Sequence, residues 1–97
     1  MAAPDEFAGM IEREEINRMR WAARRGMLEL DLLLEPFVAT RYALLDEADR
    51  HSFQQLMRCE DQDLFAWLMQ RQPPGDEEHA RIVSQILKFA HTPVQDR

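Results

Sequence analysis

The sequence predicts an all-α protein: a small bundle of five helices in a single domain. Apolar residues recur with helical spacing in five segments, and no segment alternates apolar and polar residues for long enough to form a strand. The length of 97 residues is that of one domain. We expect residues 12–91 to form the bundle, with residues 1–11 and 92–97 as loose, flexible tails.

The first two helices are expected over residues 12–24 and across the segment 30–38. In the first, the apolar stripe consists of Ile16, Met19 and Ala23. In the second, positions 30, 33, 34, 37 and 38 match the spacing of one helix face completely. Pro36 falls inside this pattern, so we expect a kink one turn before it. The alternative is that the helix ends near Glu35.

Three further helices are expected over residues 46–58, 60–70 and 76–91. The last carries its stripe at positions 82, 83, 86, 87 and 90. Breaks between the helices are predicted at Gly26 and at residues 43–46, 59–61 and 73–75.

Charge and composition exclude several classes of protein. Twelve basic against eighteen acidic residues give a net charge of −6, which disfavours a nucleic-acid-binding regulator. The single Cys59 cannot form an internal disulfide, which favours a reducing compartment. No apolar run is long enough to span a membrane, and from the acidic first residues we expect neither a signal peptide nor a transit peptide. His51, His79 and His91 are isolated, so we expect no metal site.

The segment Arg24-Arg25-Gly26-Met27-Leu28-Glu29 permits two interpretations. In the first interpretation the segment only connects two helices: the two arginines end one helix, Gly26 caps it, and Glu29 lies in the first turn of the next. As a binding face, Arg25 and Glu29 lie four residues apart on one exposed side, with open backbone at Gly26 between them. The face contains no obvious nucleophile or general base, so its work would be recognition rather than catalysis.

A second cluster of informative residues follows Cys59. Asp61 or Asp63 can cap a helix that carries large apolar side chains. We expect Trp67 in this helix to be a core residue, with an interface role as the alternative.

Taken together, residues 21–31, Pro36-Phe37 and residues 61–69 resemble the succinate dehydrogenase assembly factor family, small flavinylation factors with an Arg-Gly-x-x-Glu motif. The resemblance covers residues 18–69 and implies a five-helix bundle. It also implies a function: to help attach FAD covalently to the flavoprotein subunit of succinate dehydrogenase, and often of fumarate reductase. The motif maps onto Arg25, Gly26 and Glu29, and we expect Arg24, Met27 and Asp31 beside it to contact the partner as well.

The resemblance implies a binding factor rather than an enzyme. The partner and its FAD would perform the chemistry, and this chain would hold no stable cofactor, because it lacks a glycine-rich phosphate loop. We expect a monomer in the bacterial cytoplasm. The alternative function is that of an antitoxin-like regulatory module that binds another protein, as bacterial members of the family were once described.

Overall fold

The computed structural model describes the backbone of residues 4–93 and the side chains of residues 13–93. Five α-helices follow one another: α1 (Pro4–Ala23), α2 (Leu28–Arg41), α3 (Glu47–Leu56), α4 (Asp61–Leu68) and α5 (Glu77–Ala90). A short 3-10 turn, η1 (Tyr42–Leu44), follows α2. The predicted all-α fold with five helices is confirmed, and the part of the chain that is described contains no strand.

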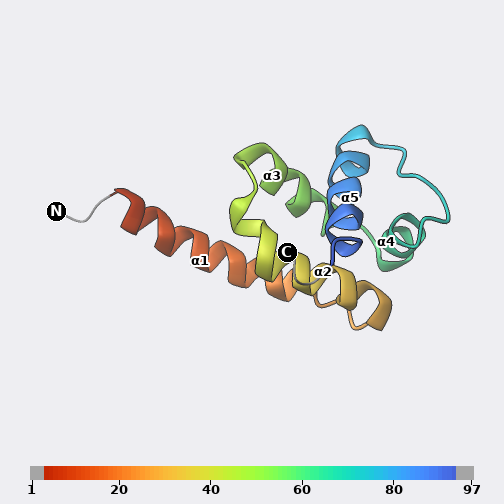
Figure 1. The fold of residues 1–97 in the computed structure, drawn as a ribbon, viewed down its shortest axis with the longest axis horizontal. Helices are drawn as coiled ribbons and strands as arrows, with labels where there is room; N and C mark the ends of the chain where they lie inside the picture. The colour runs from red at the N-terminus through yellow and green to blue at the C-terminus, as the bar shows by residue number, and fades with distance from the viewer. Residues whose placement is uncertain (1–3, 94–97) are drawn as a thin grey trace.

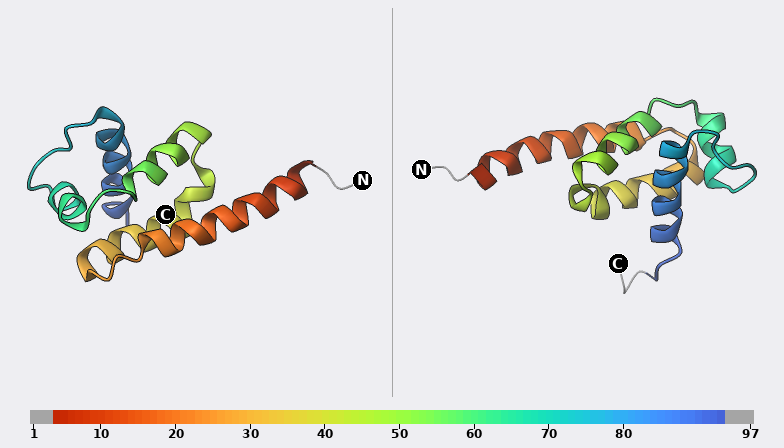
Figure 2. Two further views of the ribbon diagram at one scale, coloured as in Figure 1. Left: turned by 180° about the vertical axis from the view of Figure 1, so that it is seen from behind. Right: turned by 90° about the horizontal axis from the view of Figure 1, so that it is seen from above.

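Helices α1 and α2 form an antiparallel hairpin, and the other three helices pack above it (Figure 1). Two further views show α1 lying along α2 and its first turns projecting beyond the rest of the molecule (Figure 2). Helix α5 packs against both α2 and α3, while α4 packs against α2 and α5. The turn between α1 and α2 therefore lies at one end of the molecule, close to α4.

The core lies where α2, α3 and α5 meet. Phe37 stacks on Phe53 of α3, with ring centroids 5.6 Å apart, and meets the edge of Phe89 of α5 at 5.7 Å. Most residues of the apolar stripes predicted for the second and fifth helices face this core, with Leu33 and Leu87 only partly buried; Ala90, the last residue of the fifth stripe, is half-buried and is not among the core residues. Helix periodicity therefore identified most of the core.

Two buried aromatic residues fall outside the predicted stripes. Phe89 is buried although it is absent from the stripe predicted for its helix. Tyr42, one residue before the break predicted at residues 43–46, is fully buried, and its hydroxyl donates a hydrogen bond to Glu15 at 2.8 Å. Burial raises the pKa of Tyr42 to about 12, so its phenol stays protonated at neutral pH.

The helix bounds correct two further expectations. Helix α1 begins at Pro4 rather than at residue 12, so the backbone of residues 4–11 is helical. Residues 1–3 and 94–97 of the predicted tails lie outside the described residues. Helix α2 continues through Pro36, so the alternative of a helix that ends near Glu35 is wrong.

Two helices begin with aspartate caps. The side chain of Asp46 accepts a hydrogen bond from the backbone of Asp49 at the start of α3, and Asp76 accepts from the backbones of Glu78 and His79 at the start of α5. Such caps give backbone N–H groups of the first helical turn a partner. Within the described residues, no helix combines the length and the apolarity needed to cross a membrane.

Candidate functional site

The turn between α1 and α2 has a non-helical backbone that Gly26 makes possible. Helix α1 ends at Ala23, so Arg24 and Arg25 follow the helix instead of forming its last turn as predicted. Gly26 has φ +78°, a left-handed conformation that favours glycine, and Met27 is extended at φ −115° and ψ 116°. The chain thus reverses direction in four residues before α2 begins.

The side chain of Arg25 points into the protein and is only 16% exposed. Its Nε donates to a carboxylate oxygen of Asp61 at 2.6 Å, at the start of α4. Its two terminal nitrogens donate to three backbone carbonyls: those of Ala22 at 3.1 Å, Met57 at 2.9 Å and Cys59 at 2.8 Å. The expectation that Arg25 is an exposed cation is therefore wrong.

Arg25 links three parts of the chain through these contacts. Its guanidinium joins the end of α1, the connection after α3 and the first residue of α4. Carbonyls at helix ends lack intrahelical donors, and a planar cation with five N–H groups can satisfy several of them at once. Asp61 and Asp63, either of which was predicted to cap α4, both lie in its first turn, and Asp61 pairs with Arg25. The N-cap is Glu60, which makes no side-chain capping bond.

Asp31 and Met27 also hold the turn in place. A carboxylate oxygen of Asp31, in the first turn of α2, accepts a hydrogen bond from the backbone N–H of Arg25 at 2.8 Å. Met27 is half-buried and packs against the core. Three of the residues predicted to bind a partner are thus engaged within the protein.

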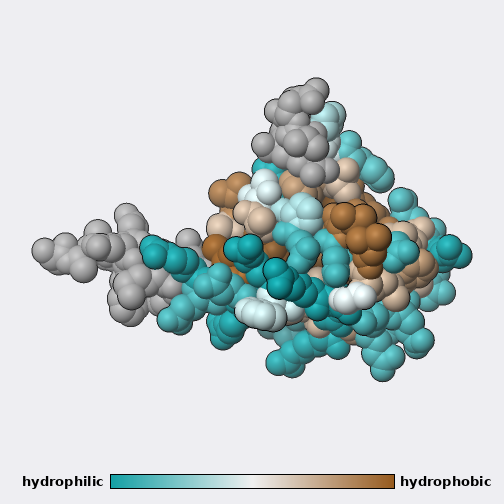
Figure 3. All heavy atoms as spheres, turned by 90° about the horizontal axis from the view of Figure 1, so that it is seen from below, coloured by the Kyte–Doolittle hydropathy of each residue, from teal (hydrophilic) through white to brown (hydrophobic). Residues whose placement is uncertain are grey.

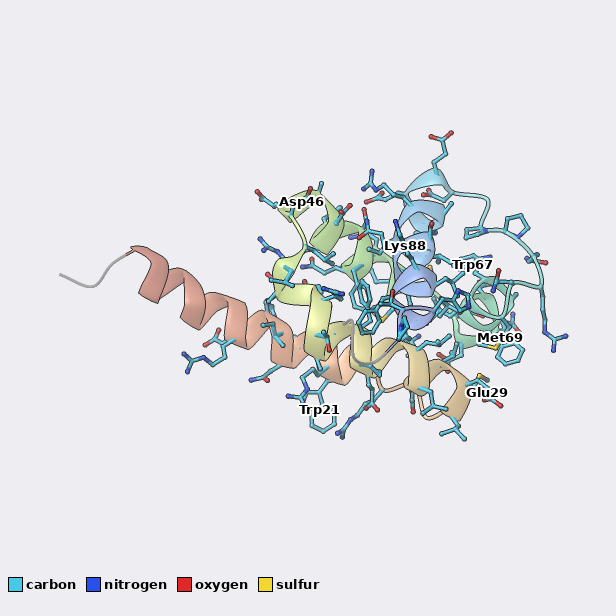
Figure 4. The ribbon with its side chains drawn as sticks, viewed as in Figure 1. Trp21, Glu29, Asp46, Trp67, Met69 and Lys88 are labelled. Carbon is cyan, nitrogen blue, oxygen red and sulfur yellow. The ribbon has the colours of Figure 1, made fainter. Side chains whose placement is uncertain are left out.

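Gly26 and Glu29 lie on the outer surface of the turn. Glu29 is exposed in the first turn of α2, where it was predicted, and Figure 4 shows it at the outer edge of the molecule. A Cβ atom added at Gly26 would meet no other atom within 4 Å. Arg25 and Glu29 do not share one exposed face, because the backbone between them is not helical and Arg25 turns inward.

Exposed apolar side chains adjoin the turn. Trp21, Leu28 and Leu32 are 73%, 68% and 64% exposed, respectively. Figure 4 shows Trp21 pointing away from the body of the protein, and Figure 3 shows hydrophobic side chains gathered among hydrophilic ones on the face formed by the hairpin. These residues were missed from the sequence, although a signal existed: each is a large apolar residue outside the core-facing stripe of its helix.

Arg24 belongs to this exposed surface. Its guanidinium lies 5.5 Å from the centre of the Trp21 ring, and its Nε contacts Glu35 at 2.9 Å. The side chain is nevertheless 60% exposed. A hollow of about 310 Å³ lies beside it, lined by residues of both helices that include Arg20, Arg24, Leu32 and Pro36. We call the surface formed by Trp21, Arg24, Gly26, Leu28, Glu29 and Leu32 the hairpin face.

Trp67 is only half-buried, so the expectation that it is a core residue holds in part. Its ring lies against that of His79, with centroids 5.5 Å apart.

The Nε2 atom of His79 is 3.8 Å from the sulfur of Cys59, and burial raises the pKa of that thiol. Among the described residues, no group of three histidine, cysteine or acidic side chains could hold a metal ion.

Comparison with known proteins identifies the family to which these features belong. Residues 17–90 match the family described as "Flavinator of succinate dehydrogenase". The chain belongs to this family. The resemblance inferred from the motifs is confirmed, and the matched range contains the hairpin face and the core helices α2 to α5.

Curated relatives of this flavinator family are similar over most of their length. The chain is 51% identical over 78 residues to a protein of Pseudomonas savastanoi pv. phaseolicola named FAD assembly factor SdhE, covering 80% of this chain and 93% of the relative. The protein of the same name from Pseudomonas aeruginosa is 50% identical, with the same coverage. That of Aliivibrio fischeri is 40% identical over 79 residues, covering 81% of this chain and 92% of the relative.

Proposed function

We propose that this chain is an assembly factor that binds the flavoprotein subunit of succinate dehydrogenase and promotes covalent attachment of FAD to it. The family description and the names of the relatives support this function. Fumarate reductase is a second partner in this proposal. We place the factor in the bacterial cytoplasm as a monomer, in keeping with its free Cys59 and a core enclosed by its own helices.

The observation that carries the docking site is the exposure of Glu29 next to the open backbone of Gly26. Both adjoin the exposed side chains of Leu28 and Leu32. A carboxylate within an apolar surface can form a charged contact that loses its water on docking, and such contacts contribute strongly to specificity. We therefore assign partner contact to the hairpin face, including Arg24.

Arg25, Met27 and Asp31 then have a different role from the one expected from the motif. They position the turn, because their side chains are engaged with the rest of this chain. Arg25 sets the path of the backbone on one side of Gly26. Asp31 ties that backbone to the start of α2, the helix that carries Glu29.

The chemistry in this proposal belongs to the partner and its flavin. In this proposal a histidine nitrogen of the flavoprotein would replace one hydrogen of a methyl group of its FAD, and the two electrons released would reduce the flavin ring itself. The factor acts by binding the partner in a state competent for that step. A binding protein shifts such an equilibrium only by its difference in affinity for the two states. In this proposal FAD stays the partner's cofactor, because the sequence lacks a glycine-rich phosphate loop.

Deleting the gene in its source cell tests this function. Covalent flavin on the flavoprotein subunit is visible by in-gel fluorescence after denaturation. We expect the signal to fall in the deletion strain and to return when the gene is restored. An undiminished signal would contradict the proposal and favour the antitoxin-like alternative. Succinate dehydrogenase and fumarate reductase give separate bands, so the same gel shows which partner depends on the factor.

A further inference from the structure

A second surface of the protein has the features of a binding groove. It lies between the end of α4, the connection 69–76 and one side of α5, and it encloses about 710 Å³. Trp67, Pro73, Pro74, Val83 and Leu87 provide its apolar lining. In Figure 4, Trp67 lies between α4 and α5, whereas Glu29 of the hairpin face lies in the first turn of α2.

The charge of this α4–α5 groove is opposite to that of the protein as a whole. Its lining includes the basic residues Arg71 and Lys88 but no aspartate or glutamate, although the chain carries eighteen acidic residues. Lys88 is the only lysine of the sequence. A cationic rim around an apolar floor attracts a ligand that carries both an apolar group and a negative charge.

The cations of the groove are not neutralised within the described part of the chain. Arg24, Arg25, Arg50 and Arg81 each pair with a carboxylate. No such ion pair is formed by Arg71 or Lys88 among residues 13–93; Arg71 instead lies 5.4 Å from the centre of the Phe65 ring. Charged groups that stay unpaired at the rim of an apolar groove remain available to a ligand.

The polar side chains of the groove suit a polypeptide. Gln70 and Gln72 line it from the connection, and both are exposed. A glutamine amide offers both donors and acceptors, which match the N–H and C=O groups of an extended main chain. Ser84 adds a hydroxyl from α5.

We propose that the α4–α5 groove binds a short linear segment of another protein in which an aromatic or aliphatic residue stands beside aspartate or glutamate. The apolar side chain occupies the floor between Trp67 and Leu87. The carboxylate contacts Lys88 and Arg71. This surface is separate from the hairpin face, so its test does not depend on flavin attachment.

Peptide titration of the full, isotope-labelled chain tests the proposal by nuclear magnetic resonance. The probes are short capped peptides with a central leucine, phenylalanine or tryptophan between two aspartates, each paired with a version in which asparagine replaces aspartate. We expect amide shifts concentrated in residues 67–91. We also expect an affinity at least about tenfold higher for the acidic peptide of a pair, and weaker binding as salt is raised.

Variants locate the binding and control for net charge. Lys88→Glu should weaken the acidic peptide at least about tenfold, and Ser84→Trp should block the groove from an exposed position of α5. Arg58→Glu makes the same kind of charge reversal at an exposed residue outside the groove and should leave binding unchanged. Melting curves of the variants show that each is folded.

Four results would overturn the proposal. Equal binding of the aspartate and asparagine peptides, or equal losses for Lys88→Glu and Arg58→Glu, would remove its charge argument. Binding that appears only after residues 94–97 are deleted would identify the chain's own end as the occupant. Shifts of residues 67–91 that grow with protein concentration without peptide would identify a second copy.

Discussion

At the scale of single residues, Arg24 and Arg25 are adjacent and chemically identical, but their side chains make different contacts. Arg25 donates four hydrogen bonds into the protein, to Asp61 and to three backbone carbonyls. Arg24 forms one exposed ion pair with Glu35 and covers the Trp21 ring. The difference arises from the path of the backbone around Gly26 and not from the residue type.

Arg25→Ala should therefore destabilise the protein more than Arg24→Ala. Removing Arg25 leaves its carbonyl partners without their charged donor, and hydrogen bonds to charged groups are worth about 1.5–3 kcal/mol each when buried. We expect a loss of at least about 2 kcal/mol for Arg25→Ala, against at most about 1 kcal/mol for the exposed pair of Arg24. Urea unfolding measures both, and equal losses would show that Arg25 does not fasten the turn.

Gly26 allows a second comparison between matched residues. A Cβ atom would meet no neighbour within 4 Å at either Gly26 or Gly75, but only Gly26 has a positive φ. Gly26→Ala should cost about 1–2 kcal/mol, because the left-handed conformation strains any residue with a Cβ. Gly75→Ala should change stability by less than about 0.5 kcal/mol. Thermal melts of the two variants that coincide would contradict this account of the turn.

At the scale of elements, α5 depends on the aspartate at its start. Hydrogen bonds from the backbone N–H groups of His79 and Glu78 lower the pKa of Asp76 below its usual value of 3.8. A carboxyl group whose pKa is lowered by folding stabilises the folded state above its unfolded pKa. That contribution disappears as the pH falls through the folded pKa.

Asp76→Asn keeps a capping side chain at this position and removes its titration. Any advantage in melting temperature that the natural protein has over the variant should be largest at neutral pH and should shrink below about pH 4. Asp46→Asn makes the same substitution at the aspartate that caps α3. Melting temperatures of the two variants over the same pH range show whether the effect is specific to the start of α5. A difference for Asp76→Asn that stays constant down to pH 2–3 would contradict the assigned role.

Local sequence patterns predicted the elements far better than they predicted the site. Stripes such as Leu30, Leu34, Phe37 and Val38 are read within one helix, so the fold class and most of the core followed directly. The direction of Arg25 depends on residues 32 to 36 positions later in the chain, which no local pattern contains. The helical start of α1 was missed because Pro4 and Gly9 are typical of tails, although proline is also common in the first turn of a helix.

At the scale of the whole molecule, Phe37 joins the helices more than Trp67 does. Phe37 contacts the rings of Phe53 and Phe89, so that its side chain unites α2, α3 and α5. Trp67 is half-buried against His79 at the edge of the core. We therefore expect the side chain at the centre of the bundle, Phe37, to contribute more to stability than the larger but half-buried side chain of Trp67.

Phe37→Ala should cost about 3–5 kcal/mol, a large share of the roughly 5–15 kcal/mol that stabilises a typical protein. Trp67→Ala should cost less, because part of the indole is already in contact with water. Calorimetry should therefore rank the melting temperatures with Phe37→Ala lowest and Trp67→Ala between it and the natural protein. The reverse order would place the centre of the core at Trp67.

The central claim is that two residues of the turn have different roles. Arg25 holds the turn in place through contacts within the protein, and the exposed Glu29 contacts the flavoprotein. The most direct test measures covalent flavin on the partner and the melting temperature of the factor for Glu29→Ala, with Glu47→Ala as the matched control. Both glutamates are exposed in the first turn of a helix, where a carboxylate adds only about 0.3–1 kcal/mol to stability. We expect both variants to melt close to the natural protein and only Glu29→Ala to lose flavin attachment, through a complex weakened by about 2–5 kcal/mol. Full attachment with Glu29→Ala, or a loss matched by an equal fall in stability, would contradict the claim.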